Sequence, residues 1–305
     1  MFRSAARRVV GAALVVLALL GGCSTGSSKA ASSAKLAVVA AEDHWGSIAT
    51  QLGGDRVVVD NIISNPDVDP HSYEPSAGDG RAVASARFVI TNGIGYDAWT
   101  DKLLAANPSP GRSVLNVGDL VGLKEGDNPH RWYSPPDVER VINAITAAYK
   151  ALDPQDAAYF DAQHARFETV GLAAYRATIA EIVGKYAGTP IGASESIVSP
   201  LAAALGLRLL TPPGLLTAIS EGNDPTASDK ATADQQIVER LVKVFVFNSQ
   251  NSTPDVQRLV DAAKAQGIPI ATVTETLTPR GSTFQDWQTR QLRDLEAALA
   301  AALGR

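Results

Sequence analysis

Residues 153–186 read DPQDAAYFDAQHARFETVGLAAYRATIAEIVGKY, and they determine how the rest of the chain divides. Asp153 can cap a helix, and Pro154 suits its first position, where a backbone N–H has no partner to lose. No further proline follows within the stretch, and Gly171 and Gly184 weaken a helix without having to break it. About thirty residues at about 1.5 Å each predict a rod of about 45–50 Å. A rod of that length indicates a stiff connection between two lobes with limited relative motion.

Short apolar runs alternate with helical stretches on the N-terminal side of this rod. Runs rich in β-branched residues predict strands at 35–40 (KLAVVA), 56–63 (RVVVDNII), 87–91 (RFVIT) and 113–117 (SVLNV). Helices are expected over 45–52 and from 135 to about 152. Strands separated by helices favour βα units and a mainly parallel sheet.

The same alternation returns on the C-terminal side of the rod. Strands are predicted at 190–194 (PIGAS), 243–248 (KVFVFN) and 269–274 (PIATVT), and an amphipathic helix over 287–303 closes the chain. The sequence therefore predicts an α/β fold of two lobes with mainly parallel sheets, joined by one long rigid helix. We expect the lobes to span residues 35–153 and 188–305, with the linking helix at 154–187.

The first 34 residues indicate export and attachment to a membrane. Three arginines precede the apolar run 9–20, which is too short to span a bilayer as a permanent helix. The run ends in LGGC, the pattern of a bacterial lipobox, so residues 1–22 are predicted to be a signal peptide and Cys23 to be lipidated. The alternative is a free cysteine beside a cleavage site. Residues 23–34 would then form a flexible tether on the outer face of the cell membrane.

The charge balance excludes one class of partner. The formal net charge is −5, and removal of the three signal arginines makes the exported part more acidic. An acidic protein of this kind is a poor candidate for nucleic-acid binding. It suits a cationic ligand better. Because the chain has a single cysteine, it can form no internal disulfide and must rely on its apolar core.

Two histidines and two glutamates stand where ligands gather in such folds. His71 follows the second predicted strand, and His130 precedes the helix that starts near residue 135. Glu195 and Glu275 each follow a strand of the second lobe, and ligands bind beyond the carboxyl ends of parallel strands. Two neutral imidazoles and two carboxylates would neutralise a divalent cation such as zinc or manganese, and the lack of thiolates argues against Cu(I). The alternative for each is an ordinary solvated surface side chain.

Further polar residues are candidates to support this site. His44 opens the first predicted βα turn, where it would be an ordering partner, another ligand or a wall of the cleft. Glu74 and Tyr73 flank His71 and could orient its imidazole by a hydrogen bond. His164 lies among polar neighbours in the rod and is expected to be solvated. Residues 220–230 (SEGNDPTASDK) are expected to form a solvated loop.

Four segments carry a resemblance to a known family: DPHSYEP (69–75), ITNGIGYDAW (90–99), NPHRWYSP (128–135) and VTETLTPRGSTFQDW (273–287). In this order they resemble the metal-binding lipoproteins of ABC importers, the zinc/manganese solute-binding family. The resemblance implies two α/β lobes joined by one long helix, with the metal between the lobes held by two residues from each. It covers nearly the whole chain that follows the tether.

The resemblance assigns His71 and His130 as ligands from the first lobe. Glu195 falls where the family has histidine or glutamate, and Glu275 falls where it usually has aspartate. The chain lacks the third histidine and the His-rich loop of many zinc-specific members, so its ligand set is similar to that of manganese-binding members. The Irving–Williams order favours zinc at almost any such site, so zinc is slightly favoured over manganese.

The expected function is capture of a divalent metal outside the cell and its delivery to a membrane permease and the ATPase of that permease. We expect a monomer without catalytic activity. A secreted metalloenzyme is one alternative, but the sequence has no HExxH helix and no GxSxG elbow. A surface adhesin lipoprotein is the other, and it would tolerate the loss of His71 and His130.

Overall fold

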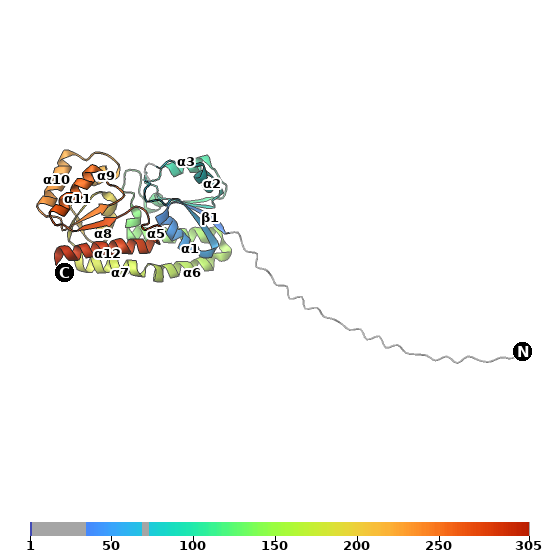
Figure 1. Cartoon of the computed structure of the whole chain (residues 1–305). Helices are drawn as coiled ribbons and strands as arrows, with labels where there is room; N and C mark the ends of the chain where they lie inside the picture. The colour runs from blue at the N-terminus through green and yellow to red at the C-terminus, as the bar shows by residue number, and fades with distance from the viewer. Residues whose placement is uncertain (2–34, 69–72, 305) are drawn as a thin grey trace. The chain divides into compact units, whose positions relative to one another are not determined.

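The computed structural model of the chain describes Met1 and residues 35–68 and 73–304 (Figure 1). The predicted signal peptide, Cys23 and the tether lie outside the described residues, and so does His71. Lys35–Arg305 form one compact unit. Within the described part of the chain, no helix is both long enough and apolar enough to cross a membrane.

The first lobe is built on a sheet of four parallel strands in the order β2-β1-β3-β4. The strands are β1 (Leu36–Glu42), β2 (Val57–Ile63), β3 (Phe88–Thr91) and β4 (Ser113–Asn116). The inner strands β1 and β3 are largely buried, as parallel strands covered on both faces must be. The accompanying helices are α1 (Asp43–Gly53), α2 (Ala77–Ser85), α3 (Trp99–Ala106) and α4 (Val117–Val121).

The second lobe repeats this arrangement, with four parallel strands in the order β6-β5-β7-β8. Its strands are β5 (Pro190–Ala193), β6 (Arg208–Leu209), β7 (Val244–Asn248) and β8 (Ile270–Val273). Its helices are α8 (Ser199–Ala204), α9 (Pro213–Ser220), α10 (Ala227–Val238), α11 (Pro254–Ala265) and α12 (Phe284–Leu303). The predicted fold class, two α/β lobes with parallel sheets, is confirmed. The expected loop at 220–230 is wrong in its last residues, because α10 begins at Ala227, capped by the Thr226 hydroxyl.

Helices connect the two sheets on one side of the compact unit (Figure 1). The first is α5 (Pro135–Leu152), and a turn at Pro154–Asp156 leads into α6 (Ala157–Arg166) and α7 (Ala173–Tyr186). Pro154 stands at the first helical position as expected, but Asp153 makes no side-chain capping bond.

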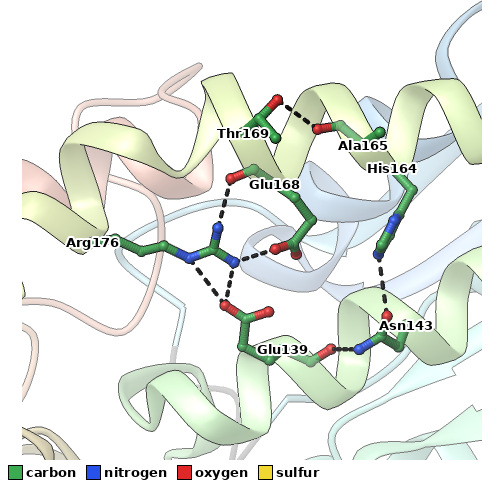
Figure 2. A network of polar contacts seen from close by, with 7 residues as sticks. All are labelled: Glu139, Asn143, His164, Ala165, Glu168, Thr169 and Arg176. Atoms are coloured by element: carbon green, nitrogen blue, oxygen red, sulfur yellow. Dashed lines mark hydrogen bonds and ion pairs between the residues drawn. The ribbon is translucent and has the colours of Figure 1, made fainter.

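A π-helical turn, Phe167–Gly171, interrupts the expected rod between α6 and α7. The Leu172 N–H donates to the Phe167 carbonyl at 2.9 Å, five residues back instead of four. Figure 2 shows how Arg176 braces this turn: its guanidinium bonds the Glu168 carbonyl at 2.6 Å and the carboxylates of Glu168 and Glu139. Because Glu139 belongs to α5, the brace ties α7 to that helix.

A continuous cluster of buried apolar side chains extends through both lobes. It joins residues of both sheets, such as Val38 and Val246, to aromatic residues between them, such as Trp132 and Trp287. Helix α12 lies against α7 and contacts β8, so the end of the chain also packs between these elements. The lobes therefore share one core instead of being linked only by a flexible hinge.

Candidate metal site

Three of the predicted ligands meet at the carboxyl ends of the strands. Glu195 lies two residues beyond β5, and Glu275 lies two residues beyond β8. His130 lies in the loop between α4 and α5. One ligand atom from each of the three lies within 4.8 Å of the others, and the three side chains are only 1%, 8% and 1% exposed for Glu195, Glu275 and His130. Such a buried convergence of one imidazole and two carboxylates has the chemistry to hold a divalent cation.

Asn128 fixes the imidazole of His130. The Asn128 Oδ1 accepts from the His130 backbone N–H at 3.0 Å and lies 3.0 Å from the ring Nδ1. An amide oxygen only accepts, so we assign the ring proton to Nδ1, which makes Nε2 the nitrogen with a lone pair for a metal. The Asn128 Nδ2 donates to the Ser196 carbonyl at 2.7 Å, so the same side chain joins the two lobes.

The carboxylates are also held by uncharged donors. The Tyr96 hydroxyl donates to Glu275 Oε2 at 2.8 Å, and Asn251 Nδ2 donates to Glu195 Oε2 at 2.6 Å. Asn248 Nδ2 donates to Oε1 of both carboxylates, at 2.6 Å for Glu195 and 2.9 Å for Glu275. Each carboxylate oxygen therefore receives a hydrogen bond that fixes the plane of its group.

Gln250 holds the backbone that carries Glu275. Its Oε1 accepts from the N–H groups of Glu275 at 2.5 Å and Thr276 at 3.0 Å. Its Nε2 donates across to the Pro66 carbonyl of the first lobe at 2.5 Å. This side chain therefore positions Glu275 relative to the first lobe as well as within its own loop.

A family model described as zinc-uptake complex component A, periplasmic, matches residues 38–298. The chain belongs to this family. Its members include metal-binding substrate-binding proteins of ABC importers, which are carriers and not enzymes. The resemblance inferred from the sequence motifs is thereby confirmed, as is the absence of catalysis from the expected function.

Curated relatives match about half of the chain. The manganese-binding lipoprotein MntA of Bacillus subtilis (strain 168) is 28% identical over 159 residues, 50% of this chain and 52% of the relative. The manganese ABC transporter substrate-binding lipoprotein PsaA of Streptococcus pneumoniae is 30% identical over 164 residues, 49% of this chain and 53% of the relative. The iron-binding protein YfeA of Yersinia pestis is 29% identical over 116 residues, 36% of this chain and 37% of the relative. The chain thus spans about half the length of MntA and of PsaA, and 37% of YfeA.

Two solved structures share the fold. The Mn-bound periplasmic metal binding protein from Candidatus Liberibacter asiaticus has a TM-score of 0.72 and 19% identity, over 87% of this chain and 100% of that one. FpvC from Pseudomonas aeruginosa, in complex with Mn²⁺, has a TM-score of 0.71 and 20% identity, over 88% of this chain and 99% of that one.

Aromatic rings line one side of the candidate site. The Trp132 ring centroid lies 5.2 Å from that of His130 and 5.0 Å from that of Tyr96. Tyr133 is also fully buried, and its hydroxyl donates to the Thr274 carbonyl at 2.8 Å. These rings exclude water from one side of the ligands, which strengthens electrostatic interactions there.

His44 belongs to this wall, and its ring lies near the backbone of Glu275. Its ring is fully buried, 4.1 Å from the Trp132 ring, and among the described residues neither of its nitrogens has a hydrogen-bond partner. Burial lowers its pKa to about 3, so the ring is neutral at physiological pH. Of the roles open to His44 from the sequence, the wall of the cleft agrees best with this packing.

The other predicted supporting residues lie elsewhere. Glu74 is exposed and has no hydrogen bond to a described residue. The Tyr73 hydroxyl donates to Asp79 Oδ2 at 2.8 Å, beside the cap of α2. On the linking helices, His164 Nε2 lies 3.2 Å from Asn143 Oδ1 (Figure 2). The residues that do order the described ligands are Asn128, Asn248, Asn251 and Tyr96, and the sequence did not single them out in this role.

A buried acid pair positions Tyr96. The Asp97 carboxylate accepts from the N–H groups of Asn92 at 2.8 Å and Gly93 at 2.7 Å, which closes the turn before Tyr96. Burial raises the pKa of Asp97 to about 6. Burial, together with the nearby charge of Asp97, raises the pKa of Glu42 well above its usual range. Glu42 therefore ionises less readily than an exposed glutamate, because burial and the charge of Asp97 both disfavour a second negative charge there.

Two polar cavities adjoin the site. The larger, about 760 Å³, is lined in part by Glu275, Asn251, Asp67 and Glu221. The other, about 390 Å³, is lined by residues next to the ligands, including Pro129 and Ser196. Glu275 itself lines the larger cavity, so that cavity adjoins the candidate site directly. Its acidic side chains would attract a cation.

Proposed function

We propose that this chain captures a divalent transition metal outside the cell and delivers it to an ABC permease and its ATPase. The convergence of His130, Glu195 and Glu275 within 4.8 Å, all buried, is the observation that carries the proposal. Ligation by buried protein groups leaves no open position for a reacting molecule, which distinguishes a carrier from a catalytic metal site. Membership of a substrate-binding family supports the same function.

We assign His71 as the fourth ligand, on the DPHSYEP motif alone. Two imidazoles and two carboxylates would give a neutral complex with a divalent ion, which suits a buried site. Attachment to the outer face of the membrane by a lipid on Cys23 and a monomeric state complete the proposal. Its support is the LGGC sequence and the lipoprotein names of relatives such as MntA and PsaA.

Manganese is the cargo we propose first, with iron second. The relatives cited above are named for manganese or iron, although the family model is named for zinc uptake. The slight preference for zinc from the Irving–Williams order finds no support in those names. Two carboxylates among the ligands also favour an oxygen-preferring ion.

Calorimetric titration of chelator-treated protein lacking residues 1–23 with Mn²⁺, Fe²⁺ and Zn²⁺ tests this function. One tight equivalent of ion is expected, and His130→Ala and Glu195→Gln should each weaken it by more than about a hundredfold, since even supporting residues cost 10–100-fold. Affinity should fall as the pH drops through about 6–7, because protonated imidazole cannot ligate.

Two exchanges outside the site serve as matched controls. His164→Ala and Glu239→Gln remove the same kinds of side chain, one on the linking helix and one at the exposed end of α10, and should leave the dissociation constant nearly unchanged. Absence of saturable binding of all three ions would refute the carrier function. An equal loss of metal affinity in the site variants and in the controls would refute the assignment of the ligands.

A further inference from the structure

One amide touches both carboxylates of the site. Asn248 is the last residue of β7 and is fully buried, between the ends of β5 and β8. Its Nδ2 lies 2.6 Å from Glu195 Oε1 and 2.9 Å from Glu275 Oε1. The two hydrogens of a side-chain amide nitrogen suffice for these two bonds, so the donor capacity of Asn248 is used in full.

The orientation of this amide is determined by its other contacts. The Asn248 Oδ1 accepts from the Gln250 backbone N–H at 3.0 Å, which requires the oxygen and not the nitrogen on that side. The Asn248 backbone N–H donates to Ser194 Oγ at 3.0 Å, and Ser194 lies next to Glu195. The amide therefore cannot turn over without losing bonds at both ends.

Two buried carboxylates side by side repel one another. Without compensation, one of them would move away or keep a proton. The partial positive charge of the Asn248 amide hydrogens lies against both groups, and this offsets the repulsion without adding a cation that would compete with the cargo. Within the part of the chain that the structure describes, Asn251 donates to Glu195 and Tyr96 donates to Glu275, whereas Asn248 donates to both carboxylates and is placed to set their separation.

We propose that Asn248 is a positioning residue that holds Glu195 and Glu275 together as an oxygen-donor pair and thereby favours Mn²⁺ over Zn²⁺. This inference rests on the proposed metal-binding function. A tetrahedral zinc ion needs one oxygen from each carboxylate, whereas manganese takes a higher number of oxygens. Fixing both carboxylates therefore matters more for manganese than for zinc.

The test compares Mn²⁺ and Zn²⁺ affinities of the wild type with those of Asn248→Leu. Leucine has the branched shape of asparagine, fills the same space and donates no hydrogen bond. The Mn²⁺ dissociation constant should rise about 10–100-fold, the range for loss of a group that orders a metal ligand, and the Zn²⁺ constant should rise less. Asn251→Leu is the matched control: it removes one donor from Glu195 and none from Glu275, together with the bond to the Ile219 carbonyl, and should reduce the preference for Mn²⁺ less.

A second variant separates positioning from folding. Asn248→Thr keeps an oxygen that can accept from the Gln250 N–H in the manner of a Ser/Thr turn, but it cannot bridge the carboxylates. It should fold, as judged by circular dichroism, and reproduce the loss of Mn²⁺ preference. A role in folding alone would lower both affinities by the same factor and leave their ratio unchanged.

The outcomes separate the two proposals. If the wild type binds no metal, the proposed function fails. If the wild type binds metal and both Asn248 variants, folded, keep its Mn²⁺ affinity and its Mn²⁺ to Zn²⁺ ratio, the role of Asn248 is refuted. Failure of both variants to fold would make Asn248 a structural residue and would equally overturn the assignment.

Discussion

Uncharged amides and one hydroxyl hold the ligand side chains of this site. Asn128 orders His130, while Asn248, Asn251 and Tyr96 bond the carboxylates. An amide or hydroxyl satisfies a buried carboxylate without neutralising it, so the charge needed by a cation is kept. At the scale of single residues, hydrogen bonds from uncharged groups therefore help to hold the described side chains of the site in place.

His44→Phe should stabilise the metal-free protein. The exchange preserves an aromatic ring against Trp132 and removes two buried nitrogens that lack partners among the described residues. Because the two nitrogens no longer have to be desolvated, the free energy of unfolding should rise by about 1 kcal/mol at neutral pH. Urea unfolding in the presence of chelator measures the difference, and a loss of stability would show that the ring nitrogens have a partner.

His44→Phe should also change how the stability of the fold depends on pH. The pKa of His44 is lowered to about 3, so the unfolded chain takes up a proton near its usual pKa while the folded chain does not. Stability should therefore fall as the pH drops below about 6.5, by about 2 kcal/mol from this residue at pH 5. His44→Phe should lack this component, while the control His164→Phe should retain it.

Sequence reasoning at this scale singled out three side chains that the structure brings together, and their role as metal ligands stays a prediction. It did not single out the residues that order them. His130, Glu195 and Glu275 were predictable because their residue types ligate metals and they follow strands or precede a helix. Asparagine is common at turns and strand ends for local reasons, so Asn248 and Asn128 carried no comparable signal. His71 stays a prediction.

At the scale of elements, the first lobe caps a helix of the second. The Phe284 N–H, at the start of α12, donates to Ser47 Oγ of α1 at 2.9 Å, while the Thr283 hydroxyl of the second lobe accepts from the Asp286 N–H of the same first turn. The side-chain amides of Gln51 and Gln285 bond one another alongside, at 2.7 and 3.1 Å. An N-terminal amide of α12 is thus satisfied only when the lobes are together.

Ser47→Ala should loosen this junction. Loss of the acceptor leaves the buried Phe284 N–H without its partner, which costs about 1 kcal/mol. Denaturant unfolding should show the loss, and hydrogen exchange at the Phe284 amide should accelerate. Ser85→Ala, an exchange of an exposed serine that bonds only within its own helix turn, is the control. Unchanged exchange at Phe284 would mean that this cap does not hold the junction.

Elements were predicted best where a periodic apolar pattern was long. The strands that the alternation marked appear within one or two residues of their expected ends, and α12 begins three residues before 287. Strand β6 has only two residues, too few for a periodic pattern of apolar side chains. The π-helical turn is braced by the contact between Arg176 and Glu139, which are far apart in the sequence. Tertiary contacts decide such details.

At the scale of the whole molecule, the lobes are tied by hydrogen bonds that involve only protein groups. They include Asp43 with the Leu277 N–H, Tyr133 with the Thr274 carbonyl, Asn128 with the Ser196 carbonyl and Gln250 with the Pro66 carbonyl. Together with the shared core, they agree with the limited domain motion expected from a helical connection. Separation of the lobes would require several of these bonds to break together.

The two-lobe architecture followed from the alternation of strands and helices on both sides of one helical stretch. The hydrogen bonds between the lobes did not, because they pair residues far apart in the sequence, such as Asp43 and Leu277. Local patterns report periodicity and chain direction, while the closeness of such residues depends on the folded geometry.

The position of Trp132 has an optical consequence. All four tryptophans, Trp45, Trp99, Trp132 and Trp287, are buried, and the Trp132 ring lies 5.2 Å from the His130 ring. Metal binding at that imidazole should alter the emission of Trp132 far more than that of the others, so the molecule carries its own fluorescent reporter. Titration with Mn²⁺ should change the intrinsic fluorescence, and Trp132→Phe should abolish the change while Trp287→Phe keeps it. The protein could then be followed as it fills and empties without any attached dye.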